Sequence, residues 1–307
     1  MLTAGLGTRL RPLTDVRAKP AIPVAGIPMV RRIIAWLASH GVTDCVLNLH
    51  YRPETIAALV GDGGDLGVRV RYSWEQPKVL GSAGGPRLAL PILGAETLLI
   101  VNGDTLTDLD LGALVRAHEE SGALVTLALV PNREFTRYGG VVLDDAGAVT
   151  GFVPRGPSAN GTGHYVGVQV AHASVFDEVR PGDAVNSIGG IYDRLIAARP
   201  GAVRGFMCDA PFWDVGTVTD YWNTSQAFAS NDAAAPAAAH APRIDASARV
   251  TRSIMWDDVT VDAGAVLDEC IVADGVHIPR GASYRHAAIV AGANGEPLAS
   301  PFETEIR

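Results

Sequence analysis

Short apolar runs alternate along the first part of the chain with stretches in which apolar side chains recur every three or four positions. The short runs predict buried strands, whereas the recurring pattern predicts helices. This alternation predicts an α/β fold with a doubly wound, mostly parallel, Rossmann-like sheet. The expected strands are 44–49, 68–72, 97–101 and 124–130, and the expected helices are 28–40, 53–60, 82–90 and 111–122.

A different pattern fills the C-terminal part, where single apolar residues are separated by turn residues. Residues 250–265 align with residues 267–282 at an offset of 17. Short repeats of this kind resemble the coils of a left-handed β-helix built from hexapeptide repeats, so about three coils are expected, with a role in packing or oligomer contact. The identical pairs are Ile254/Ile271, Asp257/Asp274, Val259/Val276, Gly264/Gly281 and Ala265/Ala282.

These patterns divide the chain into four expected segments. A main domain covers 1–229, and an Ala/Pro-rich linker without large apolar side chains covers 230–242. The repeat covers 243–291, and a tail covers 292–307.

Composition and charge narrow the class of protein. A chain of 307 residues with 48% hydrophobic and 19% charged residues can build one large domain and a small second module. No apolar run approaches the roughly 20 residues of a membrane helix, so we expect a cytoplasmic protein. A net charge of −8 without a basic run gives no source of affinity for nucleic acid, which leaves small molecules as partners. Cys45, Cys208 and Cys270 are too widely spaced for a metal motif and are expected to be reduced thiols.

A glycine-rich loop near the N-terminus carries the strongest chemical signal. It has the sequence Ala4-Gly5-Leu6-Gly7-Thr8-Arg9, and Lys19-Pro20 follows. Glycines let backbone N–H groups approach a polyphosphate closely, and Arg9 and Lys19 can balance its charge. The spacing matches neither a Walker A loop nor the dinucleotide fingerprint. The loop therefore predicts phosphate binding of another kind.

The order of glycine loop, arginine and Lys-Pro resembles the signature of the sugar-1-phosphate nucleotidyltransferases, also called nucleotide-sugar pyrophosphorylases. Three further motifs follow in the family's order: Leu80-Gly81-Ser82-Ala83-Gly84-Gly85, Val101-Asn102-Gly103-Asp104 and Trp213-Asp214-Val215-Gly216-Thr217. Together with Asn48-Leu49-His50-Tyr51, the last two look most like the mannose-1-phosphate guanylyltransferase branch. The resemblance implies an enzyme of the EC 2.7.7 class, with its nucleotidyltransferase domain over 1–229, that uses GTP and mannose 1-phosphate.

This reaction needs charge neutralisation more than it needs a general base, because the attacking sugar phosphate is already largely anionic near neutral pH. The resemblance implies that Arg9 holds the departing pyrophosphate and that Lys19 holds the phosphate groups nearer the sugar. It also implies that Asp104 and Asp214 hold a Mg²⁺ ion. The alternatives are a simple turn at Asn-Gly-Asp and a helix cap at Asp214.

The base pocket implied by the resemblance joins the start of the chain to the second glycine motif. A carboxylate at Glu75 only accepts hydrogen bonds, which suits the N–H donors of guanine, whereas Gln76 could serve a pyrimidine. The residues expected to contact the nucleotide are Leu2, Ala4, Gly5, Gly7, Thr8, Arg9, Glu75, Gly81, Ser82 and Gly84.

The expected sugar-phosphate site combines glycines with one replaced motif. Where many relatives carry Glu-Lys-Pro, this chain has Phe152-Val153-Pro154-Arg155, so Arg155 is expected to take the place of the lysine, and a surface turn is the alternative. The residues expected to contact the sugar phosphate are Lys19, Gly140, Arg155, Tyr165 and Gly167.

Three other functions are weighed against this one. The nearest is a uridylyl- or thymidylyltransferase acting on a glucose- or muramate-type 1-phosphate. A ligand-sensing homologue without activity is disfavoured because the charged residues of the motifs are kept. An acyltransferase on the repeat is disfavoured because its coils are few and short, with His277 and His286 unremarkable.

The first strand is unusually short for the family. Only Met1, Leu2 and Thr3 precede the loop, whereas relatives usually begin with a full apolar strand. Because a central strand of three residues forfeits ladder hydrogen bonds and core, we expect the natural start to lie upstream. The alternative is that the domain tolerates a short strand.

Overall fold

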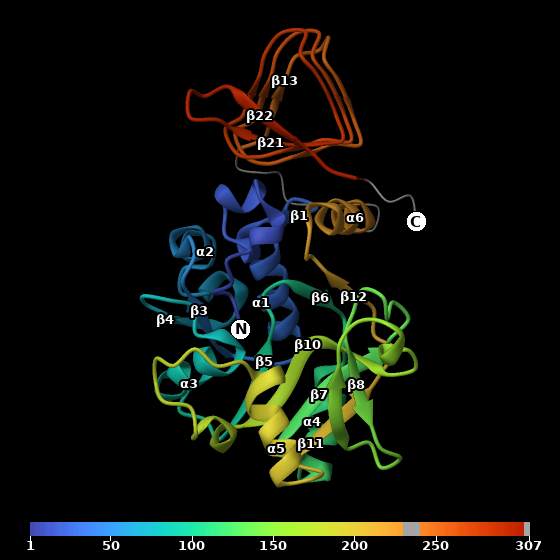
Figure 1. The fold of residues 1–307 in the computed structure, drawn as a ribbon. Coiled ribbons are helices and arrows are strands. Elements are labelled where there is room, and N and C mark those ends of the chain that lie inside the picture. The colour runs from blue at the N-terminus through green and yellow to red at the C-terminus, as the bar shows by residue number, and fades with distance from the viewer. Residues whose placement is uncertain (230–239, 304–307) are drawn as a thin grey trace. The chain divides into compact units, whose positions relative to one another are not determined.

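The computed structural model describes residues 1–229 and 240–303 (Figure 1). The chain divides into two compact units, each built from separate stretches of sequence. The first, here called the sheet unit, comprises Met1–Gly5, Ile33–Pro53 and Val60–Phe212. The second, here called the repeat unit, comprises Leu6–Arg32, Glu54–Leu59 and the described part of Trp213–Arg307. Most of the expected linker, 230–239, lies outside the described residues.

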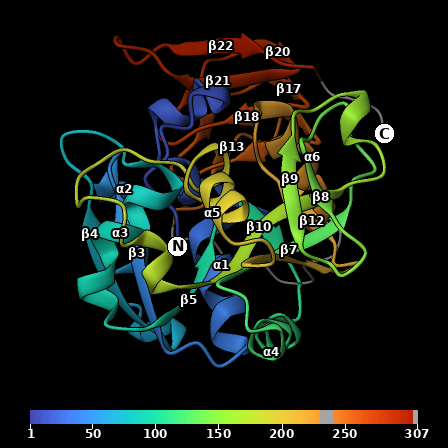
Figure 2. The ribbon, with the colours of Figure 1, turned by 60° about the horizontal axis from the view of Figure 1, so that its bottom comes forward.

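The sheet unit contains an α/β sheet with one antiparallel strand at its centre. β7 (Val125–Pro131) pairs in parallel with β11 (Val203–Met207). The long strand β10 (Gly163–His172) runs antiparallel to both β7 and β5 (Thr97–Val101), as Figure 2 shows. β8 (Gly140–Leu143) and β9 (Val149–Val153) form a hairpin at the edge beside β10.

A second, parallel part of this unit matches the expected alternation closely. β3 (Asp44–Leu49) pairs in parallel with β4 (Arg69–Trp74). The expected strands 44–49 and 97–101 have the bounds of β3 and β5, and the expected helix 82–90 lies inside α3. Outside the β-helix, the remaining elements of the two units are α1 (Met29–Ser39), α2 (Pro53–Val60), α3 (Gly81–Leu93), α4 (Leu111–Ser121), α5 (Tyr192–Ala198), α6 (Val218–Ala229), β1 (Pro23–Val24), β2 (Ile27–Pro28), β6 (Thr105–Thr107) and β12 (Phe212–Asp214). Of these, β1, β2, α6 and most of α2 belong to the repeat unit.

The core of the sheet unit explains why these runs form strands. Leu127 and Leu129 of β7 are completely buried, as are Phe176 and Tyr192 from the segments that pack on the sheet. The hydroxyl of Tyr192 donates a 2.9 Å hydrogen bond to Gln169 Oε1, so its polar end is satisfied inside the core. A continuous apolar run such as β7 is what a strand covered on both faces requires.

The first three residues occupy the position between β3 and β5. Leu2 bridges in parallel to both Asn48 and Asn102, its N–H donates to Val101 O at 2.8 Å, and its carbonyl accepts from Gly103 N at 2.9 Å. Met1 and Leu2 also line a cavity of about 310 Å³ whose walls come from β3, β4, α3 and β5. The expected first strand is therefore reduced to a single bridging residue.

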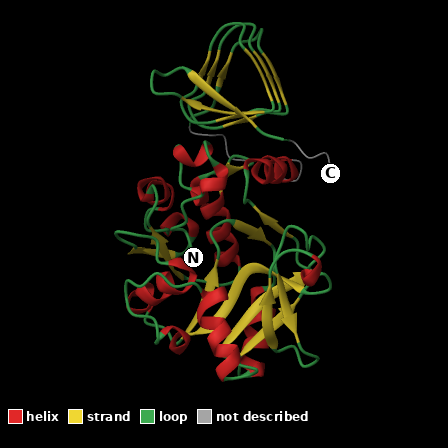
Figure 3. Ribbon diagram, viewed as in Figure 1, coloured by secondary structure: helices red, strands yellow, loops and turns green. Residues whose placement is uncertain are grey.

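The C-terminal part of the repeat unit is a short β-helix of stacked triangular coils (Figures 1 and 3). Strands one coil apart pair in parallel, and every pair is offset by 17 residues, as in Ile244–Val261–Ile278, which confirms the repeat expected from the sequence. β22 then runs antiparallel to β21, within the expected tail. The strands are β13 (Arg243–Ile244), β14 (Arg249–Thr251), β15 (Ile254–Met255), β16 (Thr260–Val261), β17 (Val266–Asp268), β18 (Ile271–Val272), β19 (His277–Ile278), β20 (Ser283–Arg285), β21 (Ala287–Ala291) and β22 (Pro297–Pro301).

Candidate functional site

The glycine-rich loop leads into short 3₁₀ turns that begin at Thr8 and are anchored by buried leucines. Leu10 and Leu13 are completely buried. Arg9, which lies between the loop glycines and Leu10 in the sequence, is exposed. Gly7 has a φ of 61°, a left-handed conformation, and its carbonyl accepts a 2.9 Å hydrogen bond from Thr14 Oγ1. A Cβ at Gly7 would lie 2.7 Å from Thr14 Cγ2 and 3.3 Å from Lys19 Cβ. The glycine therefore brings the loop against the segment that carries Lys19.

Gly7→Ala should destabilise the protein by about 2 kcal/mol, because a left-handed residue with a side chain is strained and the methyl group would also clash with Thr14. Urea unfolding of purified protein measures this loss. Gly264→Ala is the matched control, since Gly264 has a φ of 70° but nothing within 4 Å of the added carbon. Equal losses in the two variants would show that the contact with Thr14 carries no weight.

Charged side chains gather around Gly216 in the repeat unit. A Cβ at Gly216 would lie 3.3 Å from both Arg9 Nη2 and Asp214 Oδ2. The same atom would lie 3.2 Å from Asp220 Oδ2. Two of the expected catalytic residues, Arg9 and Asp214, are thus brought together although they are far apart in sequence.

The start of α6 fixes this arrangement through a reciprocal cap. Thr217 Oγ1 accepts from Asp220 N at 3.2 Å, and Asp220 Oδ2 accepts from Thr217 N at 2.9 Å, which is a capping box with aspartate in the place of glutamate. Thr217, rather than Asp214, therefore caps the helix that begins at Val218. Asp220 was not expected from the sequence, although the Thr-x-x-Asp spacing signals such a cap.

In the sheet unit, Asp104 follows β5 in a turn held by its neighbours. The preceding Asn102 donates its backbone N–H to Gly167 O at 2.8 Å. Gly167 has a φ of 82° and lies at an irregularity in the pairing of β10 with β7, and a Cβ there would meet the Asn102 side chain at 2.8 Å. Burial raises the pKa of Tyr165 well above its usual value, and the nearby Tyr192 and Asp104 add to this effect. Asp104, Tyr165 and Gly167 therefore belong to one neighbourhood.

Glu75 ties β3 to the start of α3. It is completely buried, its Oε1 accepts from Asn48 Nδ2 and its Oε2 from Leu80 N, both at 2.6 Å. A Cβ at Gly85 would lie 2.5 Å from Glu75 Oε1. The observed partners of Glu75 are thus protein groups, and its contact with a base stays a prediction.

The other glycines of the motif at residues 80–85 also pack closely against protein atoms. A Cβ at Gly81 would lie 2.6 Å from Asn186 Oδ1, and one at Gly84 would overlap the backbone carbonyl of Asp183. The hydroxyl of Ser82 accepts from Ser187 N at 2.8 Å. The motif therefore packs α3 tightly against residues 183–187.

Lys19 belongs to the repeat unit, and the other residues expected at the sugar lie in two places within the sheet unit. A Cβ at Gly140 would overlap the Thr162 hydroxyl, so this glycine serves the close packing of β8. Arg155 is exposed in the turn after β9. Nearby, the His164 ring stacks on Tyr138 with centroids 4.1 Å apart, and burial lowers the pKa of His164 to about 4, so it is neutral near pH 7.

In the part of the chain that the structure describes, protein side chains alone do not form a metal site. No group of three or more His, Cys, Asp or Glu side chains suitable for an ion occurs among these residues. Asp104 lies in the sheet unit and Asp214 in the repeat unit, and their convergence on one ion stays a prediction.

The three cysteines are free thiols, and burial raises the pKa of Cys45. Within 1–229 and 240–303, no helix is long and apolar enough to span a membrane.

Comparison with known proteins defines the class. Residues 1–231 match the family model described as nucleotidyl transferase, and the chain belongs to this family. It is a nucleotidyltransferase, as the four motifs predicted.

Its relatives act with different nucleotides and sugar phosphates. The chain is 29% identical over 295 residues to mannose-1-phosphate guanylyltransferase of Mycobacterium tuberculosis, covering 92% of this chain and 81% of that protein. It is 43% identical over 113 residues to N-acetylmuramate alpha-1-phosphate uridylyltransferase of Neisseria meningitidis, covering 37% and 49%. The crystal structure of HddC from Yersinia pseudotuberculosis shares the fold, with a TM-score of 0.63 and 24% identity over 74% of this chain and 97% of that one.

Proposed function

We propose that this protein transfers a nucleotidyl group from GTP to mannose 1-phosphate, with release of pyrophosphate. The observation that carries the proposal is the meeting of Arg9 and Asp214 at Gly216, which joins the glycine loop to the Trp-Asp-Val-Gly-Thr motif. A cation and a carboxylate side by side are suited to a polyphosphate and its metal ion.

The reaction is an in-line displacement at the α-phosphorus of the triphosphate. A phosphate oxygen of the sugar 1-phosphate forms the new bond, and the bond between the α-phosphorus and the bridging oxygen to the β-phosphorus breaks, with the electron pair leaving on pyrophosphate. Arg9 binds two oxygens of that leaving group, and Lys19 balances charge on the phosphate groups nearer the sugar. Since the attacking phosphate monoester has a second pKa of about 6, no side chain has to remove a proton.

The chemistry of the donor set fits Mg²⁺. This ion prefers one or two carboxylates completed by substrate phosphate oxygens and waters rather than a cage of protein ligands. Asp104 and Asp214, both partly exposed, would supply such carboxylates. When bound, the ion would neutralise charge that develops on the phosphate oxygens.

The preference for GTP and mannose 1-phosphate rests on a relative whose alignment covers 92% of this chain. That protein is a mannose-1-phosphate guanylyltransferase, and the alignment includes the C-terminal region as well as the sheet. Glu75 supports the choice of base only weakly, because its oxygens already accept from Asn48 and Leu80.

A second candidate is uridylyl transfer to a muramate-type 1-phosphate. It is favoured by the 43% identity to the Neisseria meningitidis enzyme, which exceeds the identity to the guanylyltransferase but covers a much shorter stretch.

Release of pyrophosphate across the five common nucleoside triphosphates and a set of sugar 1-phosphates tests both candidates. We expect kcat/KM for GTP with mannose 1-phosphate to exceed every other pair by at least about tenfold. A higher value for UTP with N-acetylmuramate 1-phosphate would replace the proposal by the second candidate. Absence of pyrophosphate release with all pairs would reject both.

A further inference from the structure

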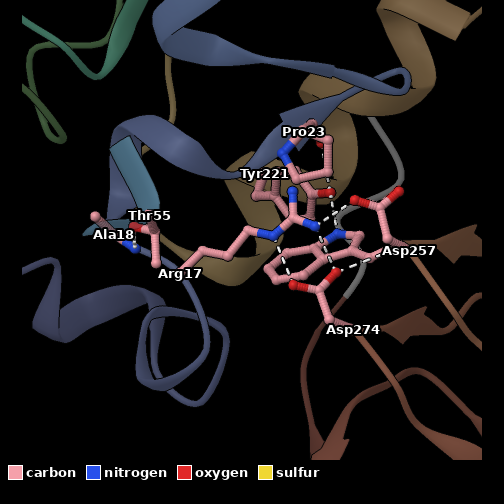
Figure 4. Close-up of polar contacts among 8 residues, drawn as sticks. Arg17, Ala18, Pro23, Thr55, Tyr221, Asp257 and Asp274 are labelled. Carbon is pink, nitrogen blue, oxygen red and sulfur yellow. Dashed lines mark hydrogen bonds and ion pairs between the residues drawn. The ribbon is translucent and has the colours of Figure 1, made fainter. Parts of the chain in front are cut away.

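Arg17, two residues before Lys19, is held by two aspartates of the β-helix. Its Nε donates to Asp274 Oδ2 and its Nη2 to Asp274 Oδ1, both at 2.6 Å, so this pair is bidentate (Figure 4). The same Nη2 donates to Asp257 Oδ2 at 2.5 Å. Only 12% of the Arg17 side chain is exposed. Partly buried, bidentate pairs of this kind fix a side chain far better than exposed single pairs do.

The repeat itself places the two aspartates together. Asp257 and Asp274 are equivalent residues of consecutive coils, just beyond β15 and β18, which pair Ile254 with Ile271. Strands in a sheet lie about 4.8 Å apart, so two like charges would stack and repel without a cation between them. Burial lowers the pKa of Arg17, but the hydrogen bonds to Asp274 and Asp257 and the attraction of their charges together outweigh burial, so the pKa is raised. Arg17 thus neutralises two like charges that the coil spacing places next to each other.

A second set of contacts reaches the other side of Lys19. The Arg17 guanidinium lies 5.4 Å from the centre of the Trp256 ring, and Trp256 Nε1 donates to the Tyr221 hydroxyl at 2.8 Å. Tyr221, completely buried in α6, donates in turn to Pro23 O at 2.7 Å. Figure 4 shows this chain of contacts from the β-helix to β1. The backbone is therefore held two residues before Lys19 and again four residues after it.

Between these anchors the segment has little freedom. Ala18 N donates to Thr55 Oγ1 at 3.1 Å, and Lys19 is 8% exposed. The backbone of Gly7 lies close to Lys19, because a Cβ at Gly7 would be 3.3 Å from Lys19 Cβ. We propose that Arg17, Asp257 and Asp274 are positioning residues through which the β-helix fixes Lys19 for the reaction. This inference rests on the proposed function, in which Lys19 neutralises phosphate charge.

Asp274→Asn tests it most directly, because one substitution weakens both bonds of the bidentate pair. We expect kcat/KM for the sugar 1-phosphate to fall about tenfold, while KM for the nucleoside triphosphate stays within about twofold. Asp257→Asn, which removes a single contact, should cause a smaller loss. Arg17→Lys keeps the charge but not the fork, and it should lose about as much as Asp274→Asn.

The matched control is Asp262→Asn, on the same β-helix. Asp262 accepts from the exposed His277 at 2.8 Å and is not among the partners of Arg17. This variant should keep the wild-type constants. A change as large as that of Asp274→Asn would mean that any lost charge on the repeat acts through stability, and it would overturn the proposal.

Hydrogen exchange of backbone amides gives a readout that does not depend on the reaction. Asp274→Asn should increase exchange in residues 17–24 in protein that remains folded by circular dichroism, and Asp262→Asn should not. Unchanged exchange in this segment would overturn the positioning role. If the wild-type protein catalyses no transfer but exchange is still faster in Asp274→Asn, the anchoring of this segment by Arg17 would stand and the proposed function would be rejected.

Discussion

Asp214→Asn should lower kcat by about a thousandfold, equivalent to about 4 kcal/mol of transition-state stabilisation, while the protein stays folded. The amide keeps the shape of the side chain but loses the negative charge that a hard divalent cation prefers. Asp104→Asn should cause a comparable loss for the same reason. Initial rates of pyrophosphate release at saturating Mg²⁺ and substrates measure both effects.

Asp108→Asn is the control for this pair of variants. Asp108 lies close to Asp104 in sequence, but it is exposed and is not assigned to the metal. Its variant should keep kcat within about twofold of wild type, as is usual for surface substitutions away from a site. Wild-type turnover in Asp104→Asn or Asp214→Asn would show that other groups hold the ion.

Gly84→Ala should be the most damaging small substitution for the fold, with a loss of about 3 kcal/mol or more in the free energy of unfolding. The added carbon would overlap the backbone carbonyl of Asp183 and lie 3.0 Å from Leu80 Cβ. Neither atom is the far end of a flexible side chain, so α3 would have to move away from residues 183–187. Urea unfolding, or the soluble yield if the variant does not fold, reports the effect.

Gly112→Ala is the matched control because it also places a methyl group near the start of a helix. The nearest atoms there are Arg116 Nη1 and Asp110 Oδ1, both 3.2 Å away and both at the ends of side chains. The end of Arg116 can give way, and Asp110 Oδ1, which accepts from Ala113 N at 3.0 Å to cap the helix, needs to shift by only a few tenths of an ångström. Alanine is also a better helix former than glycine, so stability should change by less than about 1 kcal/mol. A similar loss in both variants would contradict the packing role assigned to Gly84.

The sequence predicted elements well where one continuous pattern determines them. β3 and β5 are mostly buried and mostly apolar runs that each begin with a polar residue, and their limits were expected to the residue. The β-helix register followed from the repeat because equivalent residues of successive coils must pair. β10 was missed, since His164, Gly167 and Gln169 interrupt its apolar pattern and the irregularity at Gly167 shifts its register. Its antiparallel direction depends on tertiary pairing, which local patterns do not encode.

The site was predictable only as separate motifs. That Arg9 meets Asp214 depends on how the chain folds between them, and no local pattern reports it. Asp257 and Asp274 were visible as an identical pair of the repeat, but their partner Arg17 lies 240 and 257 residues away. Glu75 was expected to face a base because of its acceptor chemistry, whereas the structure gives it Asn48 and Leu80 as donors.

The central proposal is that Asp104 and Asp214 hold the same ion, and a double-mutant cycle tests it directly. If one ion is shared, either single substitution already removes its contribution. The double variant Asp104→Asn/Asp214→Asn should then have a kcat/KM within about threefold of the slower single variant. Losses that multiply, so that the double variant is slower by the product of the two single effects, would show independent roles and contradict the account.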